Sequence, residues 1–297
     1  MYDIGIIGGG TAGLTAAIYG QRAGKRTLVI EGLNFGGQIV NSPKVENYPG
    51  LESISGSQYS MNLLNQAMKL GAETASERVK EVREENGIKI IVTDQKEYPC
   101  KAVILATGVA HRHLGIPQEE ALAGSGVSYC ATCDGAFFRG KDVAVIGGGN
   151  SALDDALLLS EICNKVYLIH RRAEFRGDAS TLAKLEQKEN VEIIRNAKVQ
   201  EITGNGKAEI LLLDTGTALD IQGVFVAIGM IPQTEAVKNL VALDESGYIK
   251  AGEDGVTSVP GFFVAGDVRT KELRQIITAA ADGANAANSA IQYIIRK

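Results

Sequence analysis

The chain carries one sequence pattern twice, 139 residues apart. Residues 3–13 read DIGIIGGGTAG and residues 142–152 read DVAVIGGGNSA, and the two align without a gap. The alignment continues into a second apolar segment, TLVIE at residues 27–31 and VYLIH at residues 166–170. Each copy therefore predicts a strand, a glycine-rich turn, a helix and a second strand, which is the βαβ unit of a parallel sheet. Two such units predict an α/β protein with two doubly wound, Rossmann-like nucleotide-binding domains.

Both glycine-rich turns have the spacing of a pyrophosphate-binding motif. Glycine lets backbone N–H groups approach a pyrophosphate closely, and the helix that follows adds partial positive charge. Such a motif also fits a purely structural turn, but here each follows a strand and opens a helix, which favours nucleotide binding. The third glycine is replaced by Ala152 in the second copy, where the motif tolerates alanine. We expect nucleotide contacts from Gly8, Gly10, Thr11, Ala12 and Gly13 in the first copy and from Gly147, Gly149, Asn150 and Ser151 in the second.

The end of the second strand differs between the copies. Glu31 offers a carboxylate that accepts hydrogen bonds from both hydroxyls of an unmodified ribose and repels a 2′-phosphate. The equivalent place in the second copy holds His170, followed by Arg171, Arg172 and Arg176. Guanidinium groups grip a phosphate through paired hydrogen bonds, so the second copy is predicted to bind NADPH. The alternative is a solvated basic face.

Two further apolar strands end in glycine. One runs over residues 102–108 and ends in Thr107 and Gly108, and the other runs over residues 224–229 and ends in Gly229. Both glycines could line a nucleotide crevice at the carboxyl end of a sheet. A buried strand that ends in a simple turn explains each of them equally well.

Length and composition limit the classes of protein that remain. A chain of 297 residues exceeds the usual size of one core, so we expect two domains. The net charge of −5 opposes nucleic-acid binding, which needs a basic face. The first strand is predicted to begin at residue 2, which leaves no room for a signal peptide, and no apolar run is long enough to span a bilayer. We therefore expect a cytoplasmic protein with no membrane association.

The four cysteines include one C-x-x-C pair, Cys130 and Cys133. A structural zinc site needs four ligands, and Cys100 and Cys163 stand alone and far away in the sequence, so we expect no metal. A redox pair is favoured instead, with one thiol activated at a helix N-terminus. Asp134 follows the pair directly and could shuttle a proton between thiol and thiolate, or could simply be a helix N-cap.

The ordered set of motifs resembles the low-molecular-weight thioredoxin reductases of bacteria over essentially the whole chain. The resemblance rests on the two glycine motifs, the CATCDG segment at residues 130–135 and the arginine cluster, together with short segments between and after them. These segments are GGQ at 36–38, VENYPG at 45–50, ATG at 106–108, GD at 266–267 and RQ at 274–275. Thr11 departs from the family, since many relatives have proline there.

The resemblance implies a discontinuous FAD domain, residues 1–111 and 242–297, with an NADPH domain, residues 112–241, inserted between its two parts. By sequence alone, residues 111–117 and 233–244 are the expected connections. Around FAD it implies Gly37, Gln38, Asn47, Thr107, Gly108, Asp267, Arg274 and Gln275 in addition to the first glycine motif and Glu31.

The resemblance also implies a mechanism and an assembly. Electrons pass from NADPH through FAD to the Cys130–Cys133 disulfide and on to thioredoxin or a thioredoxin-like protein, with rotation of the NADPH domain between two states. Cys133 is expected to face the flavin, Cys130 to attack the protein substrate, and Asp134 to act as acid and base. A homodimer is implied as well.

Three alternatives remain open from the residues. The enzyme could be an oxidase of a small dithiol or a reductase of another thioredoxin-like protein. The donor could be ferredoxin, as the resemblance implies for some family members, although those members lack the arginine cluster. A different class is a redox sensor, in which Cys130 and Cys133 switch the conformation without turnover.

Overall fold

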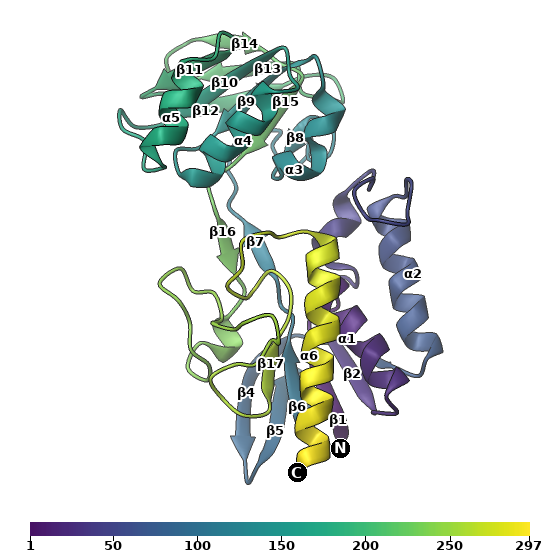
Figure 1. Ribbon diagram of the computed structural model, residues 1–297. Coiled ribbons are helices and arrows are strands. Elements are labelled where there is room, and N and C mark those ends of the chain that lie inside the picture. Colours follow the sequence, from purple (N-terminus) through teal and green to yellow (C-terminus); the bar gives the residue numbers. More distant parts are fainter. The chain divides into compact units, whose positions relative to one another are not determined.

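The computed structural model describes residues 1–297 and divides them into two compact units. The first unit comprises Met1–Ala110 and Ile231–Lys297, and the second comprises His111–Met230. Strands β7 (Val109–His111) and β16 (Met230–Pro232) carry the chain between the units and pair with each other (Figure 1). The second unit is therefore inserted into the first.

The first unit is built on a seven-stranded sheet in the order β3-β2-β1-β6-β5-β4, with β17 also paired to β6. Strands β3, β2, β1, β6 and β17 are mutually parallel, while β4, β5 and β6 form an antiparallel meander. The register pairs Ile7 with Ile30 and with Leu105, and Leu105 with Val264, so the central strands end together at one edge. The strands are β1 (Tyr2–Ile7), β2 (Thr27–Glu31), β3 (Glu73–Ser76), β4 (Val79–Glu85), β5 (Ile88–Thr93), β6 (Glu97–Leu105) and β17 (Phe262–Val264).

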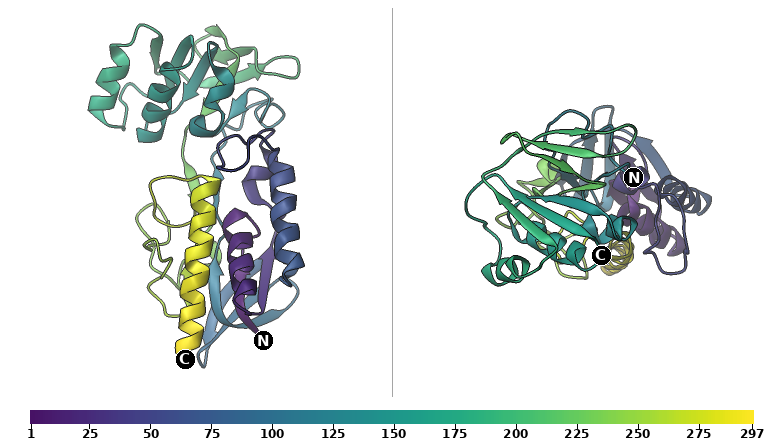
Figure 2. Two further views of the ribbon diagram at one scale, coloured as in Figure 1. Left: turned by 45° about the vertical axis from the view of Figure 1, so that its right-hand side comes forward. Right: turned by 90° about the horizontal axis from the view of Figure 1, so that it is seen from above.

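Three helices cover one face of this sheet. Helices α1 (Thr11–Arg22), α2 (Gly56–Lys69) and α6 (Ile276–Arg296) run alongside one another in Figure 1 and in the left view of Figure 2. Helix α6 approaches α1 so closely that a Cβ at Gly283 would overlap the carbonyl oxygen of Ala12. Small buried residues on both helices allow this approach, and the tight contact fixes the start of α1. Short 3₁₀ helices η1 (Gly37–Asn41) and η3 (Glu235–Val237) complete the unit.

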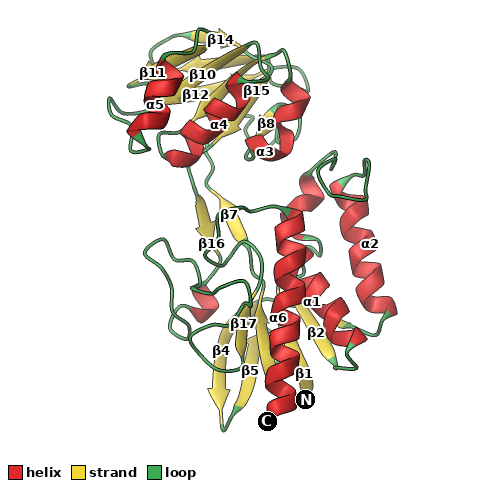
Figure 3. Ribbon diagram, viewed as in Figure 1, coloured by secondary structure: helices red, strands yellow, loops and turns green.

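The second unit has a five-stranded parallel sheet in the order β11-β10-β9-β15-β8. Helices α4 and α5 pack on one face and a three-stranded antiparallel sheet, β12-β13-β14, packs on the other (Figure 3). The alternation along β9 explains these layers, because Val143 and Val145 face the helices while Ala144 and Ile146 face the small sheet. The elements are β8 (Val127–Ser128), α3 (Ala131–Asp134), η2 (Gly135–Phe138), β9 (Asp142–Ile146), α4 (Asn150–Ser160), β10 (Lys165–His170), α5 (Ala179–Glu186), β11 (Val191–Arg195), β12 (Val199–Thr203), β13 (Ile210–Leu213), β14 (Ala218–Asp220) and β15 (Gly223–Val226).

The duplicated βαβ pattern and the α/β fold class are confirmed: β1-α1-β2 and β9-α4-β10 are the two copies. The compact units differ from the expected segments at both connections. His111 was expected in the FAD domain but belongs to the second unit. Residues 231–241 were grouped with the NADPH domain, but they belong to the first unit. Val237 and Val241 are buried in the first unit's core beside Ile249, which explains the difference. None of the helices has the length and apolar character needed to cross a membrane.

Candidate functional site

The first glycine turn lies at the carboxyl edge of the first sheet. Gly8 follows β1 and its N–H donates to Ile30 O (2.8 Å). A Cβ at Gly13 would overlap the carbonyl oxygen of Gly8, so only glycine lets α1 begin this close to the strand. Gly10 borders open space, and its only near neighbours belong to the Gly36–Gly37 turn. The backbone on this side can be approached by a ligand.

The two helices that follow the glycine turns begin without a side-chain cap. Helix α1 starts after Gly10 and helix α4 after Gly149, and neither residue can offer a side-chain acceptor. Helices α2 and α5, by contrast, are capped by Ser55 and Asp178. The free N–H groups and the helix dipole at α1 and α4 suit an anion such as a pyrophosphate.

Glu31 is tied to the first glycine turn. Its Oε2 accepts the N–H of Gly9 and its Oε1 accepts the N–H of Leu33, both at 2.8 Å. A carboxylate has about four acceptor positions, so each oxygen retains capacity for a hydroxyl donor. This arrangement fits the ribose contact that the sequence predicted.

Asp267 lies just beyond β17 at the same edge, and its Oδ1 is buried without a hydrogen-bond partner. Burial raises the pKa of this carboxyl, and the nearby Lys271 and Arg274 partly oppose the shift. Arg274 is held in place by a bond from its Nε to Asp267 O (3.2 Å) and by the Tyr248 ring. A buried carboxylate oxygen of this kind needs a donor, and a hydroxyl of a bound polyol would supply one. The first unit's residues therefore fit a flavin dinucleotide.

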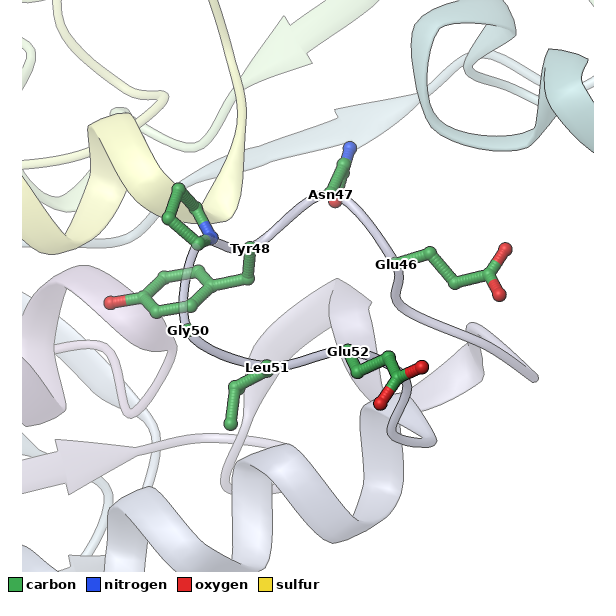
Figure 4. Close-up of a pocket in the computed structure, with 7 residues that line it drawn as sticks. Glu46, Asn47, Tyr48, Gly50, Leu51 and Glu52 are labelled. Atoms are coloured by element: carbon green, nitrogen blue, oxygen red, sulfur yellow. The ribbon is translucent and has the colours of Figure 1, made fainter.

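The other residues predicted near FAD are anchored by hydrogen bonds within the protein. Asn47 projects from the loop Glu46–Glu52, which surrounds an open hollow (Figure 4). Its Nδ2 donates to Oε1 of Gln275 (3.0 Å), the N-cap residue of α6. Gln38 Nε2 donates to Val109 O, and Thr107 Oγ1 donates to Gln233 O (2.6 Å). Gly37 packs on Gly10, so the structure brings η1 to the glycine turn.

The second unit repeats the glycine turn at the carboxyl edge of its own sheet. Gly147 follows β9, and the space around Gly149 is open. Asn150 uses its Oδ1 to accept the N–H of Asp178 (2.8 Å), while Ser151 is exposed. Gly229 lies beyond β15 at the same edge and its carbonyl accepts Arg112 N–H (3.0 Å).

His170 and the arginines that follow it occupy different environments. His170 is only 5% exposed. Its ring lies beneath Gly148, is tilted against the Phe175 ring and meets Glu174 O through Nε2 (3.1 Å). Burial lowers the pKa of His170, the hydrogen bond with Glu174 O partly opposes this, and the neighbouring arginines lower the pKa further, which favours the neutral ring. The side chains of Arg171, Arg172 and Arg176 are exposed and form no ion pair within residues 1–297. The cluster is available to an anion.

The cysteines form a disulfide at the end of strand β8. Cys130 and Cys133 are bonded, with their Cα atoms 5.3 Å apart. Cys130 is the N-cap of α3, and its Sγ accepts the N–H of Cys133 (3.2 Å). Because β8 is parallel to β15 and β9, the disulfide follows the same sheet edge as Gly147 and Gly229.

The Asp134 carboxylate accepts a hydrogen bond from Ser128, a residue that no sequence motif indicated. Ser128 donates its hydroxyl to Asp134 Oδ2 at 2.6 Å. Burial raises the pKa of the Asp134 carboxyl, and the Ser128 hydrogen bond partly lowers it. Asp134 occupies the N-cap position of η2, but its side chain makes no capping hydrogen bond there, and Cys130 is the N-cap of α3. The only signal for Ser128 in the sequence was a small polar residue two places before the first cysteine.

Comparison with known proteins identifies the family. A family model described as pyridine nucleotide-disulphide oxidoreductase matches residues 2–283. The chain belongs to this family. A thioredoxin reductase of Bacillus subtilis is 44% identical over 300 residues, covering 99% of this chain and 95% of that protein. One of Listeria monocytogenes is 43% identical, covering 99% of this chain and 94% of that protein. The crystal structure of thioredoxin reductase from Streptococcus pyogenes superposes with a TM-score of 0.96 at 40% identity, covering 100% of this chain and 99% of that one.

The remaining cysteines of this pyridine nucleotide-disulphide oxidoreductase are packing residues. Cys100 and Cys163 are free and buried. Burial raises the pKa of Cys100 to about 12 and that of Cys163 to about 11, so neither is a thiolate at neutral pH. No group of three or more histidine, cysteine or acidic side chains suited to a metal comes together in residues 1–297.

Proposed function

We propose that this oxidoreductase is an NADPH-dependent, FAD-containing thioredoxin-disulfide reductase that works in the cytoplasm as a homodimer. The observation that carries the proposal is the Cys130–Cys133 disulfide at the sheet edge that also presents the second glycine turn. A separate nucleotide site on the first unit provides for a second cofactor. The full-length similarity to thioredoxin reductases supports thioredoxin, or a thioredoxin-like protein, as the substrate.

FAD is assigned to the first unit and NADPH to the second. The uncapped start of α1, the spare acceptor capacity of Glu31 and the unpartnered Oδ1 of Asp267 support a flavin dinucleotide there. The uncapped start of α4 and the exposed Arg171, Arg172 and Arg176 support a nucleotide with a 2′-phosphate. When bound, FAD supplies the two-electron chemistry that links a nicotinamide hydride to a disulfide.

The reduced cysteine pair then exchanges with the substrate disulfide. We assign Cys130 as the nucleophile, because the Cys133 N–H points at its sulfur and would stabilise a thiolate there. Its attack forms a mixed disulfide and releases one substrate thiol. Attack by Cys133 on the Cys130 sulfur reforms the enzyme disulfide and releases the second substrate thiol. The enzyme loses two electrons and two protons, and the substrate gains them.

Asp134 handles the protons of this exchange. Its raised pKa suits a group that gives a proton to the first departing thiolate, takes one from the Cys133 thiol and passes it to the second departing thiolate. Its Oδ2 already accepts the Ser128 hydroxyl, so the proton is carried on Oδ1.

The test is NADPH oxidation by the purified yellow protein with a disulfide dye, in the presence and absence of thioredoxin. We expect turnover only when thioredoxin is present. Turnover with the dye alone would indicate a small-disulfide reductase, and reduction of the flavin without turnover would indicate a redox sensor. If ferredoxin reduces the flavin and NADPH does not, the electron donor is ferredoxin.

A further inference from the structure

We propose that Ser128 is a positioning residue for the thiol–disulfide exchange, holding the Asp134 carboxylate in place beside the redox pair. The inference rests on the proposed function, in which Asp134 is the acid–base group. It assigns a role to a residue outside the C-x-x-C segment.

Ser128 is fixed by the parallel sheet of the second unit. It is the last residue of β8, its Cα partner across the sheet is Phe225, and the residue is 5% exposed. Its hydroxyl donates to Asp134 Oδ2 at 2.6 Å and accepts the N–H of Cys130 at 3.1 Å. The Cys130 carbonyl is a poorer acceptor for the same hydrogen, at 3.4 Å. The Ser128 hydroxyl therefore links the backbone N–H of Cys130 to the carboxylate of Asp134.

This connection spans the segment whose covalent structure changes in each catalytic cycle. When the disulfide opens, the cross-link between Cys130 and Cys133 is lost, but both bonds of Ser128 can persist because neither involves a sulfur atom. Burial limits the access of water that could replace the hydroxyl. Asp134 is thereby held by the sheet and does not depend on the four-residue helix α3 alone.

The hydrogen bond also decides which oxygen exchanges the proton. Ser128 donates to Oδ2, so Oδ1 is the atom that is protonated and deprotonated, and the Ser128 hydroxyl itself neither gains nor loses a proton. Helix α4 packs against α3 and carries the neighbouring acids Asp154 and Asp155, but burial and the Ser128 bond are the causes of the Asp134 shift. Removing Ser128 removes a bond that favours the carboxylate, which raises the pKa of Asp134 further.

The experiment compares Ser128→Ala and Ser128→Thr in the FAD-loaded enzyme. The matched control is Ser160→Ala, which removes another buried hydroxyl of the second unit that bonds a backbone carbonyl, Leu157 O. Two measurements are made on each variant: the rate at which the NADPH-reduced enzyme is oxidised by thioredoxin disulfide from pH 5 to 10, and the infrared titration of the carboxyl band that Asp134→Asn removes. Flavin absorbance and thermal unfolding confirm that each variant is folded.

We expect Ser128→Ala to slow the exchange by about 10- to 100-fold at neutral pH and to move the Asp134 titration upward by about 1 pH unit. Ser128→Thr retains the hydroxyl, so it should keep most of the wild-type exchange rate and an Asp134 titration close to that of the wild type. Adding Asp134→Asn to Ser128→Ala should cost little beyond Asp134→Asn alone, because both changes remove the same function.

An unchanged titration and rate in Ser128→Ala, relative to Ser160→Ala, would overturn the proposal. So would a loss in Ser128→Thr as large as in Ser128→Ala, because the defect would then be one of packing. The infrared titration needs no substrate, so wild-type enzyme that fails to reduce thioredoxin would reject the proposed function and leave the role of Ser128 separately measurable.

Discussion

Replacing Arg171, Arg172 and Arg176 together with alanine tests how the second unit selects its nucleotide. All three side chains are exposed and form no ion pair, so their removal leaves no carboxylate unpaired and should not destabilise the fold. The Arg176 N–H that bonds Gly148 O (2.7 Å) belongs to the backbone and survives the change. The effect should therefore fall on the bound 2′-phosphate alone.

The size of the expected loss in kcat/KM for NADPH depends on how exposed the arginine cluster is. A hydrogen bond to a charged group contributes about 1.5–3 kcal/mol, and exposed ion pairs contribute about 0.2–1 kcal/mol because water screens them. We take about 1–1.5 kcal/mol for each arginine, or about a 5- to 10-fold loss in kcat/KM for NADPH in each single variant. The triple variant should lose about 10²- to 10³-fold with NADPH and little with NADH, since NADH has no 2′-phosphate.

The assay is the initial rate with each nucleotide at fixed ionic strength, with thioredoxin as acceptor. A charge-matched control replaces Lys141, Lys184 and Lys207 with alanine, because these are exposed lysines of the same unit that lie outside the arginine cluster. The control should retain its preference for NADPH. Equal losses for NADPH and NADH in the arginine variant, or an equal loss of preference in the lysine variant, would refute direct recognition of the 2′-phosphate.

Three other changes have defined outcomes. Cys133→Ser should leave NADPH able to bleach the flavin absorbance but abolish reduction of thioredoxin, so retained turnover would exclude the cysteine relay. Asp267→Asn should weaken FAD binding by about 10- to 100-fold, measured by flavin fluorescence on titration of the apoprotein, because a charged acceptor for a hydroxyl is lost. Asp282→Asn should lower the free energy of unfolding by about 3–5 kcal/mol in denaturant titration, because it leaves the buried Arg269 and Lys271 without their carboxylate partner. The pKa of Asp282 is lowered in the folded state, so this stabilisation is present above the unfolded pKa of about 4 and is lost as the pH falls through the folded value; the variant should lack that acid-dependent loss.

The fold could be predicted from the sequence because the βαβ pattern occurs twice in the chain. Each βαβ copy carried its own strand and helix periodicity, and agreement between the copies removed the ambiguity of a single glycine motif. The connection after β15 carried no such signal. Residues 231–241 form short, irregular segments, and burial of Val237 and Val241 against the first unit depends on contacts distant in sequence.

The site was predictable where the chemistry lies within a few residues. The C-x-x-C pair and the arginine cluster are local patterns, and the structure places both at sheet edges. The Asn47–Gln275 bond joins residues far apart in the chain, so only the family resemblance pointed to them. The capping of α3 by Cys130 depends on where that short helix begins, which residue spacing could not determine.

The two copies of the βαβ unit have different side chains at the end of the second strand, Glu31 and His170, and these make different contacts with the glycine turn. In the first copy Glu31 reaches back to the N–H of Gly9, which keeps a carboxylate at the mouth of the turn. In the second copy the equivalent pair is His170 and Gly148, and there the ring fills the space beneath the glycine, where a Cβ would overlap it. Such a buried, neutral ring adds no charge toward a phosphate, but it occupies the position from which a carboxylate would repel one. Selection of the 2′-phosphate then depends on the exposed arginines, with His170 supporting the turn from below. His170→Glu should therefore reduce the preference for NADPH even with all three arginines present, and an unchanged preference in the NADPH and NADH rate assay would contradict this division of roles.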